Sequence, residues 1–558
     1  MKLTPKELIC LCIIWACVSA HGAHSSEGKP HRKCGFKHNL LPEIGVSEEH
    51  PDDVANRKLL YYNSHRFKVH VDASNVRTNT DEQREYLLKV VAEQGNKIFA
   101  DKIGISGSQR IRGNPNIERY CTYGNIVTVP DRYLDYYSST NADFILLLAT
   151  EDGEEGTLAY ASACYSDRDT GRPIIGLAVF NNAYLDPSKG TLDNDVATYV
   201  HEVLHALVFS SQLFKKFPKV REFPEDPDSK LVPQYVVSNG MHYLRGTNLL
   251  KVTRDHFDCQ DISVIPLEDN GGEGSVGGHF ERVIFGDETM VAEDVSIAKF
   301  SKITLALLKD SGWYDIDLSK GDLWTWGKGE GCELFSKTCS NSSIEETCDR
   351  NNNFGCDKTF HFKMSCQSTG FTNGCKIKAL GERCTHLQKP YFFESTNINS
   401  RCQELTYNGA KFAGCVDVAC NRSKTRYQVS LGGKYPTKFI CDHEGQSHKP
   451  WKGYEFFCEN PKLICRDLCP KGCYERGKCL ENGQCMCDPL FEGEICGTFN
   501  RCRGLSRNVC YAVINSNNLD TKSYSNSYGQ ADFDPDYLRF SSWTDFHQRS
   551  LVETDSGL

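Results

Sequence analysis

From about residue 67 onward, apolar and polar residues follow regular patterns. Residues 67–71 alternate one by one, which predicts a strand, and residues 81–103 carry apolar side chains at helical spacing. Continuous apolar runs at 143–149 and 172–180 predict two buried strands. This part of the chain therefore predicts a sheet accompanied by a helix.

Two more helices are predicted further along. Residues 191–217 form one long helical pattern that ends at a proline, and the Asp-rich turn 192–195 supplies N-cap residues. Residues 296–310 form a second amphipathic helix, closed by a glycine. Because most strands precede these helices, we expect an α+β domain over residues 67–331.

Beyond Cys332 the pattern changes to short segments with Asn and Gly clusters and closely spaced cysteines. Of the 28 cysteines, 21 follow residue 331. Such a density predicts a disulfide framework and hence an oxidising compartment. We expect a cysteine-rich, loop-rich domain over residues 332–465.

Six of these cysteines have the spacing of an epidermal-growth-factor-like (EGF-like) module, C-x3-C-x5-C-x5-C-x-C-x8-C. We place this module at residues 466–497 and a polar, poorly ordered tail at 498–558. The spacing predicts the disulfides Cys469–Cys479, Cys473–Cys485 and Cys487–Cys496.

The N-terminal residues have the features of a secretory signal peptide. A lysine near the start precedes an apolar run at 8–18, and small residues before position 20 predict cleavage after Ala20. A membrane anchor is the alternative, but the run is about half of the ~20 residues that a span needs. No other run approaches a span, and the C-terminal residues lack the apolar tail of a glycolipid-anchor signal. We expect a secreted chain, or one peripherally associated with the cell surface, with a pro-segment over residues 21–66.

Composition narrows the function classes. The net charge is −9, from 64 Lys and Arg against 73 Asp and Glu, and no basic block is present, which argues against nucleic-acid binding. The hydrophobic fraction of 39% is sufficient for packed cores. Sequons at Asn341 and Asn421 fit glycosylation in the secretory pathway.

Candidate chemistry lies in the long predicted helix, at His201-Glu202-Val203-Leu204-His205. Spacing of i and i+4 places both imidazoles on one helix face, where they can share a zinc ion, with Glu202 beside the metal-bound water. A chance match or a purely structural histidine pair is the alternative.

Two histidines leave zinc short of a third protein ligand. The compact form of the motif is absent, because Val208 stands at its glycine position and Ser211 at its third histidine. His242, His256 and His279 remain possible. His279 follows two glycines, whose backbone can fold close to a metal.

Several segments together resemble the leishmanolysin family of metzincin zinc proteases. The resemblance covers about residue 67 to the cysteine-rich region. It rests on the helix at 200–207, Gly-Gly-Glu-Gly-Ser-Val-Gly-Gly-His-Phe-Glu at 271–281, Asp-Glu-Thr-Met at 287–290, and the stretches 308–314 and 326–333.

The resemblance implies a metzincin-type catalytic domain with one zinc ion per chain. Its ligands would be His201, His205 and His279, with Glu202 as general base and Met290 as the floor beneath the metal. Ordinary core packing is the alternative for Met290. The resemblance further implies the disulfides Cys121–Cys164 and Cys259–Cys332. Val208 departs from the family pattern, so we expect the helix to continue past it, and Val291-Ala292 lacks the family's proline.

Cysteine parity points to a further role. Removal of the signal peptide leaves 25 cysteines, and Cys34 resembles the family's pro-segment cysteine. Its thiolate could occupy the fourth zinc position and hold the enzyme latent. An unpaired or intermolecular cysteine is the alternative.

These features predict a secreted zinc metalloendopeptidase that hydrolyses proteins and peptides and is made as a latent zymogen. The alternative is an adhesion or receptor-binding protein on a protease scaffold. It would bind a cell-surface or matrix ligand through its cysteine-rich and EGF-like modules.

Overall fold

The structure is a computed structural model of the whole chain. It describes residues 41, 43–48, 64–106, 110–189, 192–223, 226–293, 295, 298–336, 346–348, 354–384, 387, 390–397, 399–432, 436–466, 469, 473, 477–480, 483–487, 491–499, 505–506, 508–510 and 512. The predicted signal peptide and Cys34 lie outside these residues.

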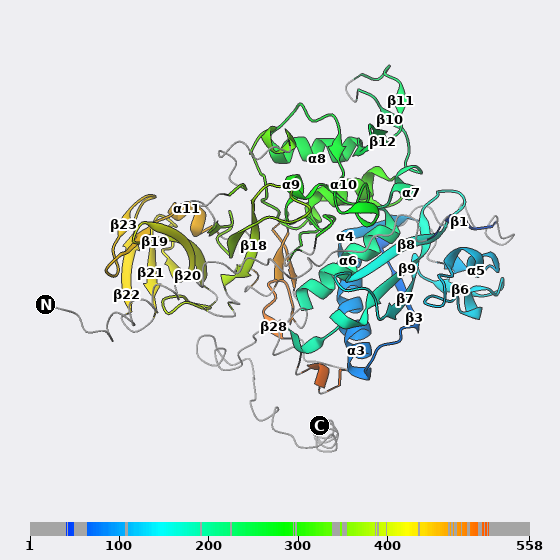
Figure 1. Cartoon of the computed structure of the whole chain (residues 1–558), viewed down its shortest axis with the longest axis horizontal. Coiled ribbons are helices and arrows are strands. Elements are labelled where there is room, and N and C mark those ends of the chain that lie inside the picture. Colours follow the sequence, from blue (N-terminus) through cyan, green and yellow to red (C-terminus); the bar gives the residue numbers. More distant parts are fainter. Residues whose placement is uncertain are drawn as a thin grey trace, which may run out of the picture.

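A five-stranded sheet in the order β1-β8-β9-β7-β3 forms the centre of the first domain (Figure 1). Strands β3, β7 and β9 are parallel, β8 runs antiparallel to β9, and β1 adds to the outer edge of β8. The bounds are Gly45–Val46 (β1), Val69–Asn75 (β3), Phe144–Glu151 (β7), Ala159–Ser166 (β8) and Pro173–Asn181 (β9). The α+β class is confirmed.

Alternate side chains of the central strands enter two separate cores. Leu146 of β7 packs with the helices α4 (Glu93–Lys102) and α6 (Leu192–Leu207), whereas Leu147 packs with α5 (Asn116–Cys121). The sheet is therefore buried on both faces, which explains its continuous apolar runs.

The helix predicted over 81–103 is present in three parts. They are α3 (Asp81–Tyr86), a π-helical segment η1 (Leu87–Ala92), and α4. Thr80 and Gln83 form a reciprocal capping box at its start. The helix α4 packs on α6, and a Cβ added to Gly95 would lie 2.2 Å from Tyr199 Cδ1.

The prediction of one long helix over 191–217 is wrong, because the structure has two helices there. The helix α6 ends at Leu207, so it does not continue past Val208, and α7 (Ser211–Phe214) follows a short turn. The backbone N–H of Phe209 donates to Leu204 O, five residues back, which closes α6. Phe209 is fully buried, so the apolar pattern runs through the break without marking it.

The other predicted helix is shorter than the pattern indicates. The helix α10 (Lys302–Asp310) begins after Ser301, whose side chain caps it. Residues 298–300 lie outside the helix, and Lys299 forms an isolated β-bridge with Glu288. Similarly, α6 begins at Leu192, so Asp193 lies in its first turn and not at the N-cap. An acidic first turn still favours the helix through the macrodipole.

Smaller elements complete the first domain. They are β2 (Ser64–Arg66), β4 (Ile103–Ser106), β5 (Arg110–Arg112), β6 (Ser139–Asn141), β10 (Val220–Arg221), β11 (Leu231–Val232), β12 (Tyr235–Ser238), β13 (Met241–Leu244), α8 (Thr247–Phe257), β14 (Ile265–Pro266), α9 (Arg282–Phe285) and β15 (Asp315–Ile316). The disulfide Cys121–Cys164 ties α5 to β8, and Cys259–Cys332 links the end of α8 to the start of the cysteine-rich domain.

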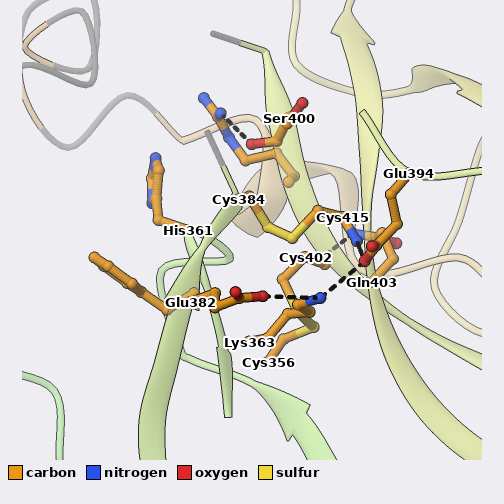
Figure 2. The surroundings of a disulfide bond; sticks show 12 residues. Cys356, His361, Lys363, Glu382, Cys384, Glu394, Ser400, Cys402, Gln403 and Cys415 are labelled. Atoms are coloured by element: carbon orange, nitrogen blue, oxygen red, sulfur yellow. Dashed lines mark hydrogen bonds and ion pairs between the residues drawn. A yellow bond between two sulfur atoms is a disulfide. The ribbon is translucent and has the colours of Figure 1, made fainter. Parts of the chain in front are cut away.

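The cysteine-rich domain contains a three-stranded sheet and a six-stranded sheet in the order β22-β21-β20-β19-β24-β23 (Figure 1). Figure 2 shows two of its disulfides, Cys356–Cys402 and Cys384–Cys415, side by side between the sheets. Nearby, Lys363 lies 3.1 Å from Glu394 and 3.7 Å from Glu382. The strands are β16 (Phe354–Cys356), β17 (Phe362–Gln367), β18 (Ile377–Arg383), β19 (Ser400–Tyr407), β20 (Ala410–Cys420), β21 (Tyr427–Leu431), β22 (Thr437–Cys441), β23 (Ser447–His448) and β24 (Tyr454–Phe457), with helix α11 (Pro461–Ile464) after them.

Within the predicted EGF-like module, the structure contains the disulfides Cys469–Cys479, Cys473–Cys485 and Cys487–Cys496. Its hairpins are β25 (Gly477–Cys479) with β26 (Cys485–Cys487), and β27 (Phe491–Glu492) with β28 (Thr498–Phe499). The predicted polar tail was expected to be poorly ordered over its whole length. Near its start, however, Leu505 and Val509 pack against the main hydrophobic core of the first domain.

The contact of α4 with α6 gives a stability prediction. Gly95→Ala removes a helix-destabilising glycine, a gain of about 1 kcal/mol. The new methyl group meets the buried Tyr199 ring, and overpacking of this kind costs about 1–3 kcal/mol. We expect a net loss of stability and a lower midpoint in thermal unfolding. Lys97→Ala, at an exposed position of α4, is the control and should change the midpoint little.

Candidate metal centre

Two of the predicted ligands and the predicted base lie on one turn of α6. His201, Glu202 and His205 are 6%, 0% and 0% exposed. Burial of three polar side chains among the apolar residues on the buried side of this helix requires partners for them. The helix therefore points to a built site.

The third histidine comes from the loop between β14 and α9. This loop folds back on itself, because the Glu268 N–H donates to His279 O and the Gly277 N–H donates to Glu268 O. Gly277 has a φ of +67°, and a Cβ there would lie 2.8 Å from His242 Cγ. Glycine is thus required where the chain turns to deliver His279, which is fully buried.

The three imidazoles converge through their Nε2 atoms. The Nε2–Nε2 distances are 2.9 Å for His201–His205, 3.1 Å for His205–His279 and 3.2 Å for His201–His279. Nitrogens that share one tetrahedral zinc ion at about 2.0–2.1 Å lie about 3.3 Å apart. The observed triangle is close to that spacing.

The contacts of the opposite ring nitrogens fix the tautomer of each ring. The Nδ1 atoms of His201, His205 and His279 lie 2.6, 2.7 and 3.1 Å from the carbonyl oxygens of Thr289, Phe209 and Ser275, respectively. A carbonyl oxygen only accepts, so each Nδ1 carries the proton and donates. The three Nε2 lone pairs then face one another, an arrangement that a shared cation stabilises. The donor set fits zinc.

Burial lowers the pKa of His201 to about 4, against the opposing effect of its hydrogen bond to Thr289 O. The imidazole is therefore neutral at pH 7, which is the form that binds metal.

The predicted Met turn adjoins this triad. Met290 is fully buried and directly follows Thr289, whose carbonyl holds His201. The buried carboxylate of Glu288 fixes the turn, since it accepts hydrogen bonds from Met290 N, Ser301 Oγ and Thr304 Oγ. Burial raises the pKa of Glu288 to about 7, although these hydrogen bonds oppose the rise.

The alternative third ligands lie elsewhere. The ring of His242 stacks on Tyr235, whose hydroxyl approaches His242 Nδ1 at 2.5 Å. His256 stacks on Trp324 at 4.2 Å, and its Nε2 lies 2.7 Å from Trp326 O. Neither imidazole lies close enough to His201 and His205 to share a metal ion with them.

Sequence reasoning missed the groups that orient the ligands. Three of them are backbone carbonyls, which leave no signature in the side-chain pattern. Glu288 did have a signal, because it lies in the Asp-Glu-Thr-Met segment at 287–290 that carries part of the family resemblance.

An H-E-x-x-H helix with a third histidine from a later loop and a methionine turn defines the metal centre of a metzincin-type metallopeptidase. The leishmanolysin (peptidase M8) family model matches residues 69–402, which is more than half of the chain. The chain belongs to the leishmanolysin family.

Individual relatives agree with this assignment. A leishmanolysin-like peptidase of Drosophila melanogaster is 28% identical over 312 residues, covering 48% of this chain and 45% of the relative. Leishmanolysin of Leishmania major is 26% identical over 274 residues (48% and 42%). A leishmanolysin homolog of Crithidia fasciculata is 22% identical over 401 residues (63% and 58%). The chain therefore spans about half the length of the curated relatives that it matches.

The geometry predicts which histidine variant loses metal. His279→Ala removes one of the three Nε2 atoms. Loss of an outer-sphere partner of a ligand typically lowers metal affinity by about 10–100-fold, so loss of a ligand should lower it at least as much. We expect zinc below stoichiometric amounts in the purified variant, measured by metal analysis after dialysis. His242→Ala is the matched control and should retain zinc; the reverse outcome would move the third ligand to His242.

Proposed function

We propose that the chain is a zinc-dependent endopeptidase that hydrolyses peptide bonds in proteins. The observation that carries the proposal is the convergence of the Nε2 atoms of His201, His205 and His279, beside Glu202, in a chain of the leishmanolysin family. Protein and peptide substrates follow from the same reasoning.

The roles of the residues follow from their positions. A zinc ion held by the three histidines supplies Lewis-acid activation of a water molecule and of the scissile carbonyl. Glu202 follows the ligand His201 directly and is fully buried, so its carboxylate acts away from bulk water. As general base, Glu202 takes the proton of the attacking water and returns it to the leaving amine. The carbonyls of Thr289, Phe209 and Ser275 hold the imidazoles in one tautomer and orientation.

Latency is part of the same proposal. Residues 45–46, within the predicted pro-segment, pair in parallel with Tyr165 and Ser166 of β8. Gln212 Nε2 donates to Leu41 O, and the Leu41 side chain is buried in the core that Leu147 shares with α5. An edge strand offers its backbone groups to extended peptides, so the pro-segment covers part of an edge that a substrate could use. Cys34 would complete the inhibition at the metal.

Secretion, or peripheral attachment to a cell surface, is proposed from the signal sequence and the disulfides. Among the helices in the described ranges, none combines the length and apolar character of a membrane span.

The activity is tested with the processed chain. We expect casein hydrolysis that a zinc chelator abolishes. Glu202→Gln should keep stoichiometric zinc and lower kcat/KM by at least about 10²-fold, the effect typical of general-base removal. Glu93→Gln, an exposed glutamate of α4, is the control. A zinc-loaded wild-type chain that hydrolyses no protein would favour the adhesion alternative, and an active Glu202→Gln variant would assign the base elsewhere.

Latency gives a separate prediction. The unprocessed chain should be inactive until mercurials or removal of the residues before about Phe67 activate it, because a zinc-bound thiolate displaces the attacking water. Cys34→Ser should be active without processing, but incompletely, since Leu41 and residues 45–46 still contact the first domain. The measurement is casein hydrolysis before and after mercurial treatment. Equal activity of unprocessed wild type and Cys34→Ser would contradict the switch.

A further inference from the structure

We propose that the EGF-like module braces the zinc site: its Lys478, through Asp322, holds the backbone segment 298–300 that positions the Met turn. The brace is defined by Lys102, Asp322 and Lys478. The inference rests on the proposed zinc site and adds positioning residues to it. Lys478 comes from a module for which the sequence suggested only a ligand-binding role.

Asp322 is the centre of the brace. Its side chain is 1% exposed, and its Oδ1 accepts from Lys102 Nζ at 2.7 Å. Its Oδ2 accepts from the backbone N–H of Phe300 at 3.0 Å, and its own N–H donates to Phe300 O at 2.9 Å. Asp322 therefore fixes both polar backbone groups of Phe300.

The module reaches the same point from the other side. Lys478, on β25, donates from Nζ to Ala298 O at 3.0 Å and lies 3.6 Å from Asp322 Oδ2. The backbone docks as well, since Leu323 N–H donates to Cys479 O at 2.9 Å and Asp322 forms an antiparallel bridge with Leu480. In Figure 1 the orange segment that carries β28 lies between the six-stranded sheet and the first domain.

The braced segment leads directly to a zinc ligand. Between Ala298 and Phe300 lies Lys299, whose carbonyl accepts from Thr289 N–H at 2.9 Å and whose N–H donates to Asp287 O at 2.8 Å. The carbonyl of the same Thr289 accepts from His201 Nδ1. From Ala298, which Lys478 contacts, the path to the His201 imidazole thus runs through Lys299 and Thr289 and includes one backbone hydrogen bond and one hydrogen bond from the His201 side chain.

Electrostatics make Lys478 more than a packing residue. Burial alone would favour the neutral form of Asp322, but Lys102, Lys478 and Lys299 outweigh this effect and lower its pKa. The charged carboxylate is the strong acceptor that Phe300 N–H requires. Removal of Lys478 eliminates one of these charges and the donor to Ala298 O, so the segment loses its hydrogen bond at Ala298 and is held less strongly at Phe300.

The test compares zinc affinities of full-length variants by competition with a chromogenic chelator, and the visible spectra of their Co²⁺ forms. Lys478→Met should lower zinc affinity by about tenfold, the lower end of the range for outer-sphere changes, and alter the Co²⁺ bands. Lys478→Arg, which keeps charge and donors, should restore both. Asp322→Asn should have a larger effect. Lys462→Met, at an exposed lysine of α11, is the matched control and should behave as wild type.

Each outcome decides one point. Wild-type affinity and spectrum in Lys478→Met would overturn the brace, as would an equal loss in Lys462→Met. If Lys478→Met does not accumulate in folded form, Lys478→Gln replaces it, since it keeps a donor and removes the charge; an unchanged affinity there also overturns the proposal. Failure of the wild-type chain to bind zinc defeats the proposed function, whereas normal wild-type binding with an unaffected Lys478→Met defeats the brace alone.

Discussion

Three imidazoles buried around one point are the constraint on which the rest of the structure depends. Each ring must place its Nδ1 proton on an acceptor, or its Nε2 lone pair turns away from the centre. The acceptors are carbonyls of Phe209, Ser275 and Thr289, which belong to three different turns. The end of α6 positions the Phe209 carbonyl. The loop that contains Gly277 and His279 positions the Ser275 carbonyl, and the Glu288 carboxylate, which accepts from Met290 N–H, holds the turn that contains Thr289. Loop residues whose side chains do not bind the metal thus belong to the site through their backbone carbonyls.

Local spacing accounts for what the sequence could predict. His201 and His205 are four residues apart on a strongly patterned helix, so their common face follows from helix geometry alone. His279 lies far along the chain, and only resemblance to a family separated it from His242 and His256. The carbonyl acceptors could not be predicted, because any residue type supplies one. The end of α6 and the start of α10 were missed for a related reason. Phe209 follows α6 and Phe300 precedes α10, but both are buried, so the hydrophobic pattern extends beyond the helices.

The cysteine pattern predicted the pairing inside the EGF-like module but not where the module lies. Cysteine spacing records which sulfurs can meet, whereas docking depends on Lys478, one of 64 basic residues with nothing in its neighbours to mark it. The face of the module around Lys478 and Leu480 contacts the first domain, so a cell-surface or matrix ligand of this module would have to use its other faces.

The contact between Lys478 and Asp322 also sets an order of events during biosynthesis. Lys478 leaves the ribosome more than a hundred residues after Asp322, and its hairpin is closed by Cys469–Cys479 and Cys473–Cys485. Asp322 is therefore synthesised well before the lysine that contacts it, and this contact can form only after translation has passed the module. The proposed brace would therefore need an oxidising compartment, where the disulfides that shape this hairpin persist.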